Sequence, residues 1–348
     1  GGTKFIGRKV VEILLTRGHM VTLFHRGQHE EQVDPQVEHI HGDKAHLRDL
    51  QDTLRQRRFE AVIDMVADNG DDAQQSIDIF RGQIRQAVYL SSQNVYSPWG
   101  AVHNLPYEEL AIPFPEESPL RQVWFLHKGR ADHYEKILME QAVMQAHQDG
   151  DFPATVLRLP AVYGPRDYQV REYPFIKRIQ DKRRFLVLGR GANWLWQRGY
   201  VDDVALAVVQ AAEQPEQAAG QIFNVGHRQV WTIEGLARQL ARIMNWEWEI
   251  HAVPDEILAP QALFYPKLPH IVADTDKIRR LLGWQETVSQ EEALARTVEW
   301  HVAHPPDHEH LPYSFDYDLE EEILNDYQAM IEAKKREEAQ LEALSTER

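Results

Sequence analysis

The sequence predicts an α/β protein in which helices cover both faces of a parallel sheet. Short β-branched apolar runs alternate with helical stretches through the first 160 residues. These runs are apolar almost throughout, as in strands that are buried on both faces. A glycine-containing turn, GGTKFIG, opens the chain and leads directly into a helical segment. Together these features indicate a doubly wound, Rossmann-type domain.

The expected strands are residues 20–24, 61–67, 86–92 and 154–159. Gly18 is placed to end the helix that precedes the first of them, because glycine readily adopts the left-handed backbone found there. Thr232 is a candidate helix start. Residues 312–348 are expected to form a charged tail helix. Its apolar residues are sparse and do not occupy the a and d positions of four successive heptads. This favours a solvated helix over a coiled coil.

Composition excludes several classes of function. The chain has no cysteine, so thiolate catalysis, disulfides and cysteine-ligated zinc are ruled out. The formal charge of -16 would repel a phosphate backbone, so nucleic-acid binding is disfavoured though not excluded. No apolar run approaches the length of a membrane span. We expect a cytoplasmic protein with no metal site and no membrane partner.

A turn such as GGTKFIG normally follows the central strand of its sheet, yet no residue precedes Gly1 in the sequence. We therefore expect the strands around 21–24 and 62–66 to flank an unfilled position. Their unpaired backbone groups should make this exact chain fold poorly. Some six apolar, β-branched residues placed before Gly1 should rescue solubility and cofactor binding.

The turn itself is typical of a phosphate site. Glycine lets the backbone approach a ligand closely, and the helix that follows directs free N–H groups at an anion. An NAD site usually has an acid at the end of the second strand, for the ribose 2′-hydroxyl. Here Arg26 stands there, which favours NADP; a solvated loop arginine is the alternative.

Eight motifs follow one another in an order that resembles a known family. They are GGTKFIG, HGD (41–43), YLSSQNVYS (89–97), HKGRAD, LRLPAVYGPRD (157–167), RGYVDDVALAV (198–208), GQIFNVG (220–226) and LLGWQETVSQEEALARTVEW. The chain resembles the NAD-dependent epimerase/dehydratase family, the extended short-chain dehydrogenase/reductases. The GGTKFIG turn resembles the turn found in an atypical branch of this family, which includes chloroplast stem-loop RNA-binding proteins.

The resemblance implies a cofactor site and a domain division. The family's G-x-x-G-x-x-G pattern falls on Gly1, Lys4 and Gly7, with a lysine at the middle glycine. The implied cofactor-binding residues are Gly1, Thr3, Lys4, Phe5, Ile6, Gly7, Arg26, Asp43, Ala67 and Lys128. The cofactor domain would span 1–160, with 196–226 returning to it. Residues 161–195 and 227–311 would form the substrate domain, and 312–348 a tail.

The family's catalytic set is a Ser or Thr, a Tyr, and a Lys four residues after that Tyr. Ser92 and Lys128 fit this pattern, and Trp124 stands at the tyrosine position. An indole cannot act as an acid or base near neutral pH. Three alternatives stay open: His127 substitutes, the protein binds cofactor without turnover, or a substrate group or water transfers the proton.

The expected function is an NADP- or NAD-dependent oxidoreductase or epimerase acting on a small hydroxyl or carbonyl substrate, such as a sugar or sugar nucleotide. The resemblance implies that Arg198 meets a substrate diphosphate; a surface ion-pair partner is the alternative. Neutral Gln93 and Asn94 replace the acidic pair of family dehydratases, so dehydration is disfavoured. The alternative is a non-catalytic, NADP-binding regulatory or RNA-associated protein. A homodimer is expected through the helix after Lys128.

Overall fold

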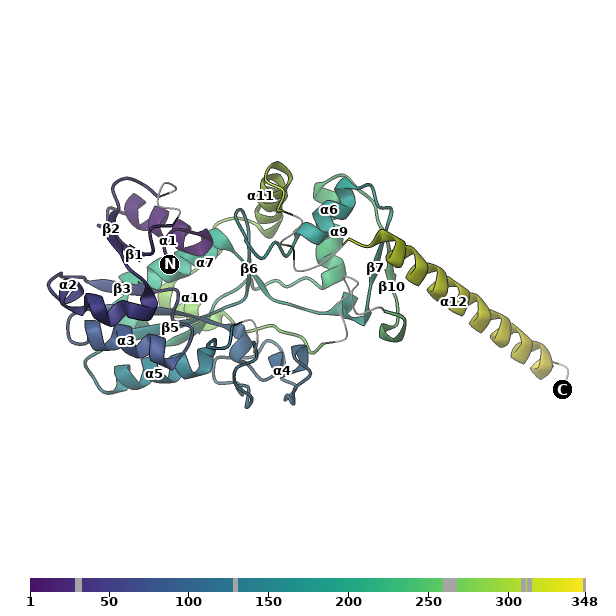
Figure 1. The fold of residues 1–348 in the computed structure, drawn as a ribbon. Helices are drawn as coiled ribbons and strands as arrows, with labels where there is room; N and C mark the ends of the chain where they lie inside the picture. The colour runs from purple at the N-terminus through teal and green to yellow at the C-terminus, as the bar shows by residue number, and fades with distance from the viewer. Residues whose placement is uncertain (29–32, 128–130, 259–267, 308–310, 312–314, 347–348) are drawn as a thin grey trace. The chain divides into compact units, whose positions relative to one another are not determined.

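The computed structural model describes residues 1–28, 33–127, 131–258, 268–307, 311 and 315–346 (Figure 1). The chain divides into two compact units. Residues 1–171, 196–230 and 269–297 form the first unit, and residues 172–195, 231–268 and 298–348 form the second.

The first unit is built on parallel strands. Its elements are α1 (Phe5–Thr16), β1 (Thr22–His25), β2 (Glu38–His41), η2 (Lys44–Leu50), α2 (Gln51–Arg55), β3 (Ala61–Asp64), α3 (Gly70–Phe80), β4 (Gln86–Ser92), η3 (Gln93–Val95), α4 (Trp99–Val102), α5 (Lys136–Gln148), β5 (Ala154–Leu159), β6 (Ala161–Tyr163), β8 (Arg198–Tyr200), α7 (Val201–Glu213), α8 (Pro215–Ala218), β9 (Ile222–Asn224) and α10 (Asp276–Leu282). The helix α11 (Gln290–Ala303) begins in this unit.

A four-stranded parallel sheet with the order β3-β4-β5-β9 forms the centre of this unit. Helices α3 and α5 pack together on one face, and α7 packs on the other (Figure 1). Ile77, Met139 and Val143 fill the core beneath α3 and α5, against Tyr89 and Val156 of the sheet. The α/β class and the parallel sheet predicted from the sequence are therefore confirmed.

The strands β1 and β2 form a separate parallel pair. Neither β1 nor β3 pairs with the other in the described part of the chain, as the sequence predicts. A cavity of about 830 Å³ lies between them, lined by α1, β1 and β3 among other elements. We call this space the strand slot. Its walls include apolar side chains such as Val10, Leu23 and Val62.

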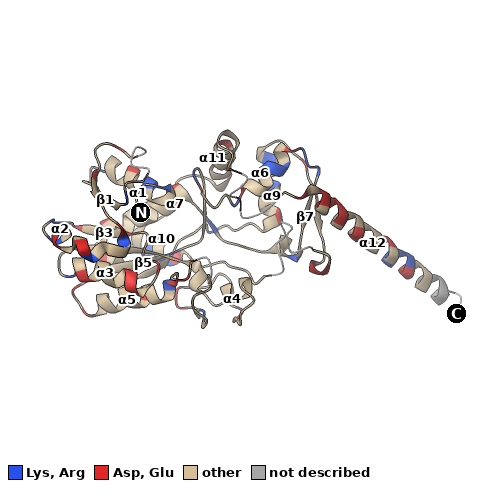
Figure 2. Cartoon of the chain, viewed as in Figure 1, with Lys and Arg blue, Asp and Glu red and all other residues tan. Residues whose placement is uncertain are grey.

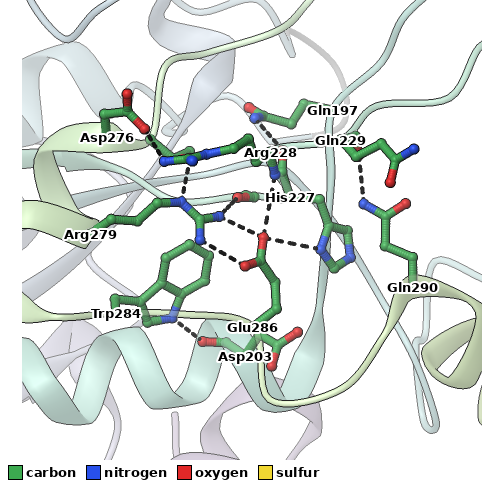
Figure 3. A network of polar contacts seen from close by, with 12 residues as sticks. Gln197, Asp203, His227, Arg228, Gln229, Asp276, Arg279, Trp284, Glu286 and Gln290 are labelled. Atoms are coloured by element: carbon green, nitrogen blue, oxygen red, sulfur yellow. Dashed lines mark hydrogen bonds and ion pairs between the residues drawn. The ribbon is translucent and has the colours of Figure 1, made fainter.

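A polar network attaches residues 276–290 to the rest of the first unit (Figure 3). Arg279 forms a double hydrogen bond with Glu286, one at 2.7 Å, and its guanidinium stacks over the Trp284 ring at 4.5 Å. The Trp284 indole donates to the backbone oxygen of Asp203 in α7 at 2.8 Å. Partial burial disfavours the charged Glu286 carboxyl, but His227 and Arg279 outweigh it and lower the pKa of Glu286. Because His227 Nδ1 lies 3.9 Å away, Arg279 is the stronger partner.

The second unit holds α6 (Tyr173–Gln180), β7 (Phe185–Leu188), η4 (Arg190–Asn193), α9 (Ile233–Ile243), β10 (Glu249–Ala252), η5 (Asp255–Ile257) and α12 (Tyr317–Thr346). The strands β7 and β10 pair in parallel. As predicted, Thr232 caps a helix: its hydroxyl accepts from the Gly235 N–H at 2.9 Å.

The start of α12 is anchored in the second unit. Ile323 and Leu324 are buried against Val187 and Val253. Arg178 is 1% exposed and forms an ion pair with Glu320. Arg178 of α6 therefore anchors the start of α12. None of the described helices is long and apolar enough to cross a bilayer.

Candidate functional site

A cavity of about 630 Å³ opens at the carboxyl ends of the strands in the first unit. In open α/β sheets this edge is where ligands bind. Nine residues predicted from the sequence line it: Gly1, Thr3, Lys4, Phe5, Ile6, Gly7, Arg26, Asp43 and Ser92. The structure therefore brings most of the predicted cofactor residues together in one cavity.

The turn before α1 is packed so tightly that Gly7 has no room for a side chain. A Cβ on Gly7 would lie 2.0 Å from the backbone oxygen of Gly1. Phe5, the first residue of α1, has a φ of 40°, which is strained for a residue with a side chain. Backbone strain of this kind is typical of ligand sites. The turn is thus a close backbone cradle that fits a phosphate group.

A partly buried ion pair lies beside the cradle. Lys44 Nζ is 3.0 Å from Asp64 Oδ1, at the end of β3. Asp64 Oδ1 also accepts the backbone N–H groups of Val66 and Ala67, at 3.0 and 2.9 Å. Burial disfavours the charged carboxylate, but Lys44 and these hydrogen bonds outweigh it and lower the pKa of Asp64. Asp64 thereby fixes the turn that follows β3, whose Met65 and Val66 line the cavity.

A second group of polar residues lies at the end of β4. The Tyr134 hydroxyl is 3.3 Å from Asn94 Nδ2 and also interacts with the Ser92 side chain. Lys136 Nζ lies 5.2 Å from the centre of the Tyr134 ring and donates to the Ala67 oxygen at 2.6 Å. Burial raises the pKa of Tyr134 and lowers that of Lys136. A serine, a tyrosine and a lysine are therefore brought together.

Between Tyr134 and Lys136, Glu135 is completely buried. Its carboxylate accepts from Arg121 Nη2 at 3.0 Å and from the Phe125 N–H at 2.8 Å. It also caps α5 by accepting the Ile137 N–H at 3.0 Å. Arg121 in turn donates to the backbone oxygen of Asn94. This pair connects the turn that carries Ser92 and Asn94 to the turn that carries Tyr134.

The other predicted catalytic residues and the predicted substrate residue Arg198 are placed differently. Trp124 is 46% exposed and does not line the cavity. His127 packs edge-on against the Tyr134 ring, with the ring centres 5.2 Å apart. Lys128 lies outside the described residues. Arg198 is buried and stacks on Trp196 at 5.1 Å, away from the cavity walls.

Sequence reasoning did not select Tyr134 and Lys136. The family spacing puts the lysine four positions after the tyrosine, whereas Lys136 is only two positions after Tyr134. In the structure Lys136 is the first residue of α5, directly after the N-capping Glu135, and no sequence pattern marks this pair. Ala67, the remaining predicted residue, is buried, and its backbone oxygen holds Lys136.

Comparisons with known proteins agree with the α/β fold of this chain. The chain is 28% identical to the chloroplast stem-loop binding protein of 41 kDa b of Arabidopsis thaliana, over 84% of this chain and 76% of that protein. It is 24% identical to a UDP-N-acetyl-alpha-D-glucosaminuronate decarboxylase of Bacillus cytotoxicus, over 86% of this chain and 95% of the enzyme. Among solved structures, dTDP-glucose 4,6-dehydratase of Bacillus anthracis matches with a TM-score of 0.68 and 16% identity, over 87% of this chain and 95% of that one. The family model of the NAD dependent epimerase/dehydratase family matches residues 1–226, and the chain belongs to this family.

Proposed function

We propose that the chain binds NADP in preference to NAD, and that Ser92, Tyr134 and Lys136 exchange a proton with a small hydroxyl or carbonyl substrate. The observation that carries this proposal is the Tyr134 hydroxyl beside Ser92 and Asn94, with Lys136 next to its ring. The relatives named as UDP- and dTDP-sugar enzymes favour a sugar nucleotide as the substrate.

Each residue has a distinct part in this proposal. The Tyr134 hydroxyl is protonated near neutral pH, so it can donate a proton to a substrate oxygen. Burial raises its pKa, so the phenolate that remains after the donation needs a nearby positive charge. The Ser92 hydroxyl orients that oxygen, and the Lys136 ammonium stabilises negative charge as it develops on the phenol. A bound nicotinamide would supply or accept the hydride. Lys136 takes the place that the sequence assigns to Lys128, because Lys136 is buried beside Tyr134.

The preference for NADP rests on the charges at the cavity. Arg26 is exposed at its wall and forms no ion pair with any residue that the structure describes. A guanidinium can hold a 2′-phosphate through two parallel hydrogen bonds. Lys4, which lines the same cavity, adds a second positive charge.

Titration of the full chain with NADP and with NAD tests the cofactor assignment. Arg26→Ala should weaken NADP binding by about tenfold or more and leave NAD binding nearly unchanged, because a charge-assisted contact to phosphate is lost. Arg48→Ala, which removes an exposed arginine that lies outside the cavity walls, is the matched control. Equal losses for both cofactors would show that Arg26 does not contact the 2′ position.

Turnover is tested with UDP- and dTDP-sugars by following nicotinamide absorbance and product formation. Tyr134→Phe should abolish turnover while NADP affinity stays the same, and Tyr107→Phe, at an exposed tyrosine, should change neither. NADP binding without turnover in any variant would favour the non-catalytic alternative. RNA binding would then be measured directly, with the charge of -16 counting against it.

A further inference from the structure

The outer part of α12 differs from the anchored start of the helix. After Tyr327, the described side chains of α12 are almost all exposed. Their ion pairs stay within the helix, such as Lys334 with Glu338 and Arg336 with Glu332. A helical segment without tertiary contacts is only marginally stable in water. The outer part of α12 therefore lacks the packing that stabilises most protein helices.

One face of this outer part carries a repeating pattern. Tyr327, which packs at the anchored start of the helix, is followed by Met330, Lys334, Glu337 and Leu341 at alternating intervals of three and four residues. This is the spacing of the contact positions in a two-helix coiled coil. Met330 is 44% exposed and Leu341 is 67% exposed, both large values for apolar side chains. We call these five residues the α12 seam.

The α12 seam is complementary to itself in one orientation. When two copies run antiparallel with the centre of symmetry between Lys334 and Glu337, Met330 of each copy faces Leu341 of the other. Lys334 then faces Glu337, which is a favourable pair. In a parallel, in-register arrangement Lys334 would face Lys334 and Glu337 would face Glu337, which is repulsive.

We propose that the α12 seam binds a second copy of this chain in an antiparallel helix pair. Figure 2 shows the basic stretch of α12 lying beyond its acidic first turns. The seam covers 15 residues, or about 22 Å of helix, with a polar pair at its centre. Such a short seam gives a weak dimer that forms at micromolar concentrations. The proposal is independent of cofactor binding.

Exchanging the charges of Lys334 and Glu337 in the full chain tests which residues of the two helices face each other. Sedimentation velocity over about 1–100 µM measures the dimerisation affinity of each variant. Lys334→Glu and Glu337→Lys should each weaken dimerisation by about tenfold or more, because each places like charges opposite each other. The double variant should restore the parent affinity. Arg336→Glu, at an exposed position off the seam, is the control and should have little effect.

Cysteine cross-linking tests the orientation, and the natural chain has no cysteine to interfere. Met330→Cys mixed with Leu341→Cys should form a disulfide-linked dimer under mild oxidation. Met330→Cys alone should not, because its two copies would lie about 16 Å apart along the helices, beyond the reach of a disulfide. A monomer at all concentrations, a dimer that ignores the charge exchange, or efficient linking of Met330→Cys to itself would each overturn the proposal.

Discussion

Replacing Glu135 by glutamine would test whether the buried pair beside Tyr134 holds the candidate site in place. Glutamine keeps the size of the side chain and can still accept the Ile137 N–H at the start of α5. It removes the negative charge that faces Arg121, whose side chain is 3% exposed. The guanidinium would then be buried without a counter-ion.

Removing one partner of a buried ion pair costs about 3–5 kcal/mol. Arg121 keeps its hydrogen bonds to the backbone oxygens of Asn94 and Val123, so we expect the lower end of this range, about 3 kcal/mol. For a unit of this size, that corresponds to a fall in melting temperature of roughly 6–12 °C.

Urea unfolding followed by tryptophan fluorescence measures the change in the free energy of unfolding. Glu216→Gln, at a carboxylate that is 69% exposed, is the matched control and should cost less than about 0.5 kcal/mol. The double variant Arg121→Met with Glu135→Gln should be more stable than Glu135→Gln alone, because it leaves no buried charge. A cost below about 1 kcal/mol for Glu135→Gln would refute the reasoning.

Three further outcomes follow from the structure. Gly7→Ala should abolish NADP binding in an equilibrium titration, because its Cβ would lie 2.0 Å from the Gly1 oxygen; unchanged affinity would contradict the cradle. Since the pKa of Glu286 is lowered in the folded chain, its contribution to stability is present above the ordinary carboxyl pKa and is lost as the pH falls below it. Thermal scans between about pH 3 and 7 should therefore show a weaker pH dependence for Glu286→Gln, and an unchanged profile would count against the Arg279 pair. Finally, an extended apolar, β-branched peptide should bind the strand slot and raise the melting temperature, whereas a scrambled charged peptide should not.

The fold was predictable because its signals are local. The strands β4 and β5 have the predicted bounds, since their continuous apolar runs leave little ambiguity. Gly7 could be assigned from sequence for the same reason: a turn that must approach a phosphate requires glycine at a position of close contact. That β1 and β3 do not pair with each other followed from topology alone.

The proton-transfer group could not be predicted in this way. Tyr134 reaches Ser92 only because the irregular chain before α5 is held by the pair of Arg121 and Glu135, a contact across 14 residues of sequence. No periodic pattern marks such a contact. A search for the family spacing instead selects Trp124 and Lys128, whose parts in catalysis stay predictions.

The strand slot has a consequence for the behaviour of this chain in solution. The facing edges of β1 and β3 present backbone donors and acceptors in strand geometry, and such edges are templates for intermolecular β-sheet formation. Where no strand of the same chain fills this slot, we expect an apolar segment from a neighbouring molecule to enter it, which would lead to aggregation or domain swapping as the concentration rises. Self-association through the strand slot would produce particles without a defined stoichiometry, whereas the α12 helix pair stops at a dimer. Light scattering would distinguish these two kinds of assembly by their mass.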